Sequence, residues 1–261
     1  MLAERPPLDE KKRERDFEWD QKEMPLTEHL RELRNRLFIC VVTIAALAVL
    51  LLPAADWVIP RLTKLYFGNI TLHAFAPTDA VWAIFKLALY GAVVLGLPVI
   101  LFQIWMFVVP AVHPRTRRAV YSYVAPSFVL ALGGIAFAHF LVIPRVIFGL
   151  DAITQGIASA TYGIEATMNL VLLLLLAFAI VFQTPIVMLL LARIGLISST
   201  LLRKYRRYIG FGMLVVGAFL APDGSPVTMC LLAGPMYVLF ETSIWIIVFM
   251  ERQWKREALD T

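Results

Sequence analysis

Long apolar runs separated by short charged segments make up most of the chain after residue 36. We place six of them near 37–59, 80–108, 119–142, 168–193, 208–221 and 227–249. A helix rises about 1.5 Å per residue, so about 20 residues cross the ~30 Å apolar core of a bilayer. Apolar residues are continuous in these runs, whereas the strands of a membrane barrel alternate apolar and polar residues. The pattern therefore predicts an all-α integral membrane protein with six transmembrane helices.

The fifth run, YIGFGMLVVGAFLA at 208–221, is shorter than the others. Its roughly 14 residues reach only about 21 Å as a helix. We therefore expect it to lie in thinned bilayer or against other helices.

Composition excludes the main alternatives to a membrane protein. The 261 residues are 60% hydrophobic and 16% charged, whereas a soluble domain is about half apolar and a quarter charged. A disordered chain would need low hydrophobicity and high charge. Neither a water-soluble globule nor a disordered protein fits these values.

The charged ends divide the chain into three parts. Residues 1–24 mix both signs densely and predict a disordered cytoplasmic tail. The membrane domain is expected over 25–250, and 251–261 form a basic cytoplasmic tail. The membrane domain opens with an amphipathic helix over 25–36, because apolar residues recur there at helical spacing: Leu26, Leu30, Leu33 and Leu37.

The connections between the runs differ strongly in positive charge. Twenty of the 24 lysines and arginines lie before residue 37, in 109–118, in 193–207 or at the C-terminal end. The remaining connections hold three, and Lys86 lies inside the second run. Because cytoplasmic connections carry the excess of Lys and Arg, both termini are predicted to be cytoplasmic.

Motifs for enzymatic chemistry are missing. The sequence contains no phosphate-binding G-x-x-x-x-G-K-[ST], no H-E-x-x-H and no G-x-S-x-G. Cys40 and Cys230 fall in separate apolar runs, which argues against a disulfide and a metal site. We expect no enzyme activity, no metal, no cofactor and no nucleic-acid partner.

Polar residues inside the apolar runs are costly and therefore informative. Gln183 and Glu241 fall at a similar depth in the predicted cytoplasmic third of the fourth and sixth runs. They predict a shared water-accessible concavity, and the alternative is that each bonds a neighbouring helix or extends to the membrane surface. Pro98 and Pro185 are expected to kink the second and fourth runs.

Five strings occur in an order that resembles the TatC family, the polytopic receptor subunit of the twin-arginine protein translocase. They are PLTEHLRELRNRL, LPVILFQIWMFVVPAVHPRTRR, FQTPIV, APD and PMYVLFE. The resemblance implies a glove-shaped arrangement of six helices with a concave face, in which the fifth and sixth spans are short. It also implies a bacterial cytoplasmic membrane, or alternatively a thylakoid or mitochondrial inner membrane.

The resemblance further implies a function and partners. A member of this family would bind signal peptides with paired arginines and export folded proteins by using the proton gradient. It would act in the lipid bilayer with TatA-like and TatB-like single-span proteins, and as a homo-oligomer.

The resemblance places the signal-peptide site at the cytoplasmic ends of the first two spans. Glu32 matches the acid of the N-terminal motif, and Arg34 flanks it. The alternative for Glu32 is a helix-surface charge paired with Arg36 four residues later. Thr116 stands where the family has a second glutamate. Either Glu28 or another acid compensates, or the role of the protein is weakened or changed.

Further site residues follow from the same resemblance. Phe107 lies at the end of the second span and Gln183 in the fourth, and both are assigned to signal-peptide binding. Asp223 and Glu241 are assigned to the membrane cavity or to partner contacts. The loss of the second acid leaves one alternative open, a TatC-like structural subunit of another membrane complex. A small-solute transporter has little support, because repeats and midplane charges are missing.

Overall fold

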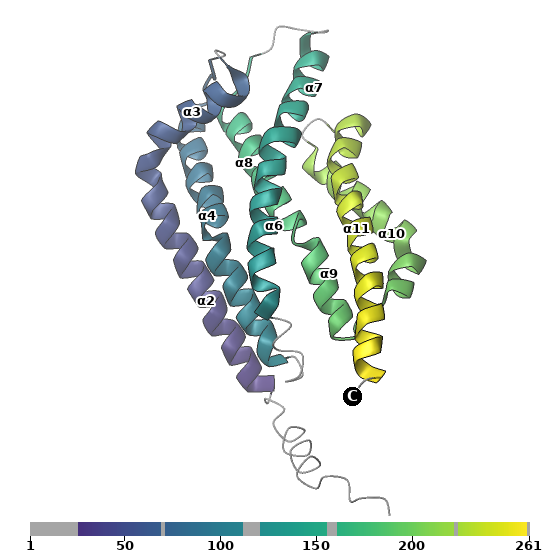
Figure 1. The fold of residues 1–261 in the computed structure, drawn as a ribbon. Helices are drawn as coiled ribbons and strands as arrows, with labels where there is room; N and C mark the ends of the chain where they lie inside the picture. The colour runs from purple at the N-terminus through teal and green to yellow at the C-terminus, as the bar shows by residue number, and fades with distance from the viewer. Residues whose placement is uncertain (1–25, 69–70, 112–120, 156–160, 222–223, 260–261) are drawn as a thin grey trace, which may run out of the picture.

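The structure, a computed structural model, describes residues 26–68, 71–111, 121–155, 161–221 and 224–259 (Figure 1). Helices make up most of this part of the chain, short turns and loops connect them, and one isolated backbone bridge among the described residues joins His73 and Gly163. The elements are α2 (Leu26–Leu51), η1 (Leu52–Ala54), α3 (Ala55–Phe67), α4 (Asp79–Ala111), α6 (Val124–Phe137), η2 (Ala138–Val142), α7 (Ile143–Gln155), α8 (Ile164–Val181), α9 (Thr184–Arg193), α10 (Ser199–Leu220) and α11 (Pro226–Leu259). The all-α prediction is confirmed.

The long helices pack side by side (Figure 1). The first, α2, lies along α4, and α4 and α6 both pack on α8. On the other side, α11 packs on α9 and α10. The helices α8 and α9 therefore join the N-terminal helices to the C-terminal pair.

Five segments of the described chain are long and apolar enough to cross a membrane. They are Glu28–Phe67, Asp79–Val109, Val124–Ala152, Ile164–Arg193 and Pro226–Trp254. The predicted fifth run, 208–221, forms the second half of α10, whose first half carries four basic residues. This charge excludes α10 from the apolar segments, so the count of six spans stays a prediction.

The first run does not end where the sequence pattern indicates. Pro53 lies in the short η1 segment, and α3 continues to Phe67 as a separate helix. Proline lacks a backbone N–H and clashes with the preceding turn, which explains the end of α2 at Leu51. In Figure 1, α3 lies across the end of the helices farthest from the C-terminus.

The third run also extends beyond its predicted end at 142. A π-helical turn, η2, connects α6 directly to the 13-residue α7. Such a turn widens the helix by one residue, next to Pro144, which cannot donate a backbone hydrogen bond. The segment 143–155, which lies beyond the predicted end of the third run, therefore continues the same helix.

The predicted kink at Pro185 is confirmed. The helix is interrupted at 182–183, and α9 begins with Pro185 in its first turn. By contrast, α4 is continuous through Pro98.

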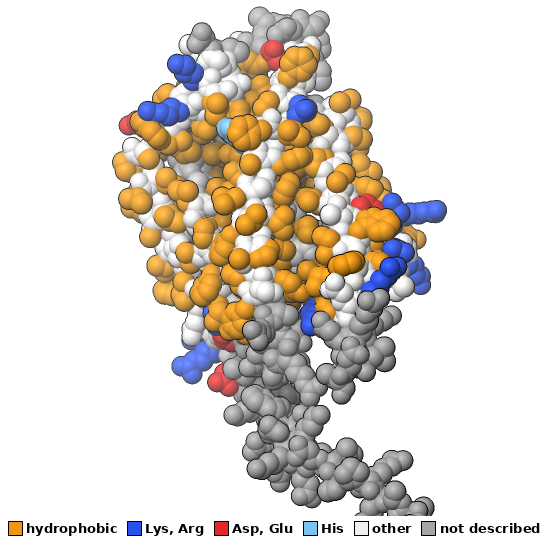
Figure 2. All heavy atoms as spheres, viewed as in Figure 1, with side chains coloured by type: hydrophobic (Ala, Val, Ile, Leu, Met, Phe, Trp, Pro, Cys, Tyr) orange, Lys and Arg blue, Asp and Glu red, His pale blue; other side chains and the backbone are white. Residues whose placement is uncertain are grey.

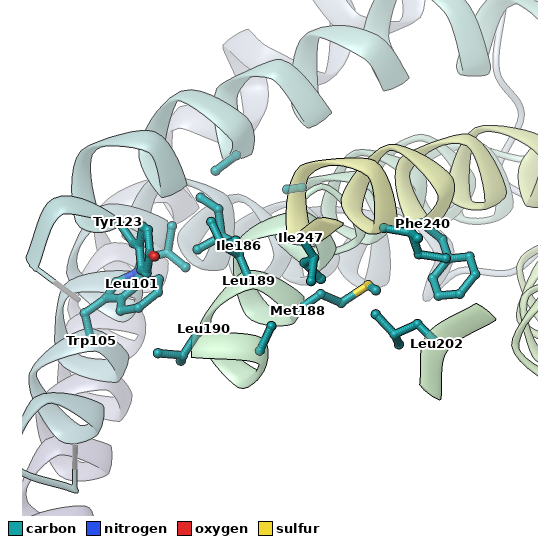
Figure 3. Close-up of a cluster of buried hydrophobic side chains, with 14 of the residues drawn as sticks. Leu101, Trp105, Tyr123, Ile186, Met188, Leu189, Leu190, Leu202, Phe240 and Ile247 are labelled. Carbon is teal, nitrogen blue, oxygen red and sulfur yellow. The ribbon is translucent and has the colours of Figure 1, made fainter. Parts of the chain in front are cut away.

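Two glycines bring helices into close contact. A Cβ atom on Gly134 of α6 would lie within 3.0 Å of the Phe178 carbonyl oxygen of α8. A Cβ atom on Gly217 of α10 would lie 2.8 Å from the Met229 carbonyl oxygen of α11. Small residues permit this backbone approach, which is how membrane helices associate in lipid. Elsewhere large apolar side chains fill the core, as in the cluster shown in Figure 3.

Candidate functional site

The first predicted site residue, Glu32, lies where the start of α2 meets the end of α4. Arg36 donates from Nε to Glu32 Oε1 at 3.0 Å and from Nη1 to Gln103 Oε1 at 3.2 Å. A second guanidinium nitrogen of Arg36 also contacts Glu32 Oε1. The side chains of Arg36 and Glu32 are 21% and 23% exposed. The carboxylate is thus fixed in position and still reachable from outside.

An aromatic pair lies beside this ionic cluster. The rings of His29 and Phe107 stack with centroids 4.4 Å apart and an interplanar angle of 16°. His29 precedes Glu32 by three residues on α2, and Phe107 follows Gln103 by four residues on α4. Residues at these spacings share one helix face, so both pairs lie along the same α2–α4 contact.

The structure brings together only some of the predicted site residues. Glu32 and Phe107 belong to one cluster, whereas Glu28 and Arg34 are exposed on α2. The pairing of Glu32 with Arg36, which we considered as the alternative, is present. Gln103 was missed at the sequence level, although it is a polar residue inside an apolar run. Two predicted site residues, Thr116 and Asp223, lie outside the described residues.

Gln183 lies at the break between α8 and α9. Its Nε2 donates to the Ser127 carbonyl oxygen of α6 at 3.1 Å and to that of Ala179 at 3.5 Å. The buried Ser127 hydroxyl accepts from Trp105 Nε1 of α4 at 3.1 Å. These bonds join α4, α6 and α8 through polar groups, which is the alternative we considered for Gln183.

Glu241 of α11 pairs with Arg206 of α10. The Arg206 Nε also donates to the Tyr237 hydroxyl at 2.8 Å. The buried Glu241 Oε1 contacts Arg206 Nε as an ion pair and has no other polar partner within the described part of the chain. Gln183 and Glu241 therefore have separate partners, and the concavity that they were expected to share stays a prediction.

Polar contacts also hold the opposite end of the helices. Lys86 of α4 forms an ion pair with Glu165 of α8. Tyr162 donates to Asp151 Oδ1 at 2.7 Å. Burial, with a contribution from the Asp151 carboxylate, raises the pKa of Tyr162 to about 12. The tyrosine therefore stays protonated, and it ties the end of α7 to the start of α8.

No metal site is evident among the residues that the structure describes. In these ranges, no three His, Cys, Asp or Glu side chains lie close enough to hold a common ion. Cys40 and Cys230 are free thiols.

The sequence matches a family described as "TatC: Sec-independent protein translocase protein (TatC)" over residues 28–235. The chain is similar to a TatC protein of Aquifex aeolicus, with 34% identity over 85% of this chain and 94% of the relative. A chloroplastic TATC of Arabidopsis thaliana is 29% identical over 87% of this chain and 67% of the relative. These relatives give no support to a structural subunit of another complex.

Solved structures agree with the sequence comparison. The fold is similar to a crystal structure of the "Twin Arginine Translocase Receptor- TatC in DDM", with a TM-score of 0.77 and 31% identity. That match covers 84% of this chain and 99% of the solved one. The helices, their order and their packing are therefore shared with this receptor. This chain is a multi-pass membrane protein of the TatC family and a component of the Sec-independent protein translocase.

Proposed function

We propose that this protein is the receptor subunit of the translocase and binds signal peptides that carry paired arginines. The observation that carries the proposal is that one oxygen of the Glu32 carboxylate is free to accept a hydrogen bond. Both Arg36 contacts go to Oε1, and Oε2 accepts no hydrogen bond within the described residues. A guanidinium from a signal peptide can therefore bind Oε2 in a charge-assisted contact.

The second arginine of the peptide needs another acceptor. Glu28 lies one helical turn before Glu32 on α2 and is exposed. Residues four apart on a helix have Cβ atoms about 6 Å apart, so the two carboxylates can bind adjacent arginines. Glu28 would then replace the acid that Thr116 does not supply, and Arg34 would hold the motif in position.

The apolar part of the signal peptide would follow the helices inward. Phe107 stacks on His29, one helical turn before Glu32, and Gln183 lies at the α8–α9 break. We propose that the peptide passes along these residues towards the middle of the membrane domain. Asp223 and Glu241 would serve partner or cavity contacts near α10 and α11.

The wider setting of the site is part of the same proposal. Six spans with both termini in the cytoplasm fit the distribution of Lys and Arg between the connections. The receptor would act in a bacterial cytoplasmic membrane, or in a thylakoid or mitochondrial membrane. It would work as a homo-oligomer with TatA-like and TatB-like single-span proteins, and the proton gradient would drive export of folded precursors.

A photocrosslinking experiment tests this path. A crosslinking amino acid in place of Phe107 or Gln183 should capture a radiolabelled precursor with a twin-arginine signal. The matched control is Phe148, which is 75% exposed on α7 at the opposite end. The proposal would be contradicted if the yield of crosslinked precursor from positions 107 and 183 were no higher than the yield from position 148.

A further inference from the structure

The basic first half of α10 borders a groove that the proposed signal-peptide site does not use. The groove has a volume of about 500 Å³ and is lined by Arg206, Arg207, Gly210, Phe211, Leu214 and Tyr237. Figure 2 shows a cluster of basic side chains on this flank of the molecule, next to an apolar surface. Charge at one end and apolar side chains at the other give the groove two chemically different parts.

The charged end of the groove holds positive charge that the described residues do not fully neutralise. Residues 203–207 include four basic side chains, and Glu241 pairs with Arg206. Arg207 is exposed and makes no ion pair or hydrogen bond with any described residue. Arg203 lies over the Trp245 ring, with its guanidinium carbon 5.9 Å from the centroid. This end therefore offers an anion an unpaired guanidinium at the mouth of the groove.

The apolar end continues from this charge along α10. The apolar run begins at Tyr208, directly after Arg207. Leu214 lies seven residues after Arg207, about 10 Å further along the helix. Gly210 shapes the floor, because a Cβ atom there would lie 3.3 Å from the Tyr237 ring. If the predicted fifth run spans the membrane from the cytoplasmic side, the charged end of the groove lies at the level of lipid headgroups and the apolar end at the level of acyl chains.

We infer that this groove binds one phospholipid with an anionic headgroup. The phosphate would contact Arg206 and Arg207, and an acyl chain would lie along Phe211 and Leu214. A soluble anion would use only the charged end, whereas a phospholipid fills both parts. Charge complementarity therefore favours an anionic lipid over a zwitterionic one.

Native mass spectrometry of the purified full-length protein tests this inference. Phosphatidylglycerol is titrated against phosphatidylcholine with identical acyl chains. We expect one phosphatidylglycerol to bind at least five times more tightly than phosphatidylcholine. Arg207→Gln should weaken phosphatidylglycerol binding about fivefold. The control Arg252→Gln removes an exposed charge on α11 outside the groove and should change the affinity little.

A second arm separates a lipid site from a simple anion site. Leu214→Trp fills the apolar end and should weaken phosphatidylglycerol binding. Glycerol phosphate, which has the charge without the chains, should fail to displace the bound lipid. Gel filtration and thermal unfolding establish that each variant is folded. If Leu214→Trp does not fold, binding by Arg207→Gln still tests the inference.

Several results would overturn the inference. They are equal retention of both lipids, unchanged binding by Arg207→Gln, and displacement of the lipid by glycerol phosphate. Photocrosslinking from position 214 in membranes must give a lipid adduct. A single-span protein found there in place of lipid would assign the groove to that partner instead.

Discussion

Replacing Glu32 with glutamine will abolish export of a twin-arginine reporter. The substitution keeps the size of the side chain but removes the charge that an incoming guanidinium needs. Loss of a charge-assisted hydrogen bond costs roughly 1.5–3 kcal/mol, or about 10- to 100-fold in peptide affinity. Export is measured as the fraction of reporter outside the cytoplasm, with the amount of variant in the membrane determined in parallel. Asp56→Asn, which changes an exposed acid in α3, is the control and should export normally.

Arg36→Gln separates a receptor role of Glu32 from a structural one. If Glu32 served only to pair with Arg36, both substitutions would break the same contact and impair export equally. If Glu32 binds the signal peptide, Arg36→Gln leaves its carboxylate available and retains most of the export. Equal defects in the two variants, or normal export by Glu32→Gln at full protein level, would contradict the receptor role.

Gly134→Ala will lower the thermal stability of the protein, although the substitution adds only one methyl group. The new methyl group would overlap the Phe178 carbonyl oxygen, so α6 and α8 must move apart. Overpacking of this kind costs about 1–3 kcal/mol, which corresponds to a midpoint lower by roughly 3–10 °C. The midpoint is measured in detergent by loss of the folded protein on heating.

The adjacent glycine provides the matched control. A Cβ atom on Gly133 would lie 3.9 Å from its nearest neighbour, a ring atom of Phe182, which is an ordinary contact. Alanine also favours the helix over glycine by about 0.5–1 kcal/mol. Gly133→Ala should therefore be neutral or slightly stabilising. Similar midpoints for the two variants would show that the α6–α8 contact is looser than described.

The sequence pattern predicted correctly that the apolar runs form helices, because continuous apolar residues in lipid require helical backbone hydrogen bonding. Continuous apolar residues gave the all-helical fold, and Pro185 gave the break between α8 and α9. The pattern was wrong at the ends of helices. Ile143–Gln155 continues the third helix through a π-helical turn, and such a local change in hydrogen bonding leaves no mark in hydropathy.

The site was predictable only in part, for a related reason. Glu32 and Phe107 could be named from the sequence, because their strings resemble the TatC family. The contact of Gln103 with Arg36, and the bond between Gln183 and the Ser127 carbonyl, depend on which helix faces lie against each other. A single sequence carries no information about that register, so the partners of these groups emerge only from the fold.

Binding of a synthetic signal peptide to the purified protein in lipid nanodiscs tests the receptor function most directly. A fluorescent peptide with paired arginines is titrated beside the same peptide with paired lysines. Arginine presents two donors in a fixed geometry to a carboxylate, whereas lysine presents a single charge. We predict at least tenfold tighter binding of the arginine peptide. Equal affinity for the two peptides, or no saturable binding of either, would contradict the proposed function.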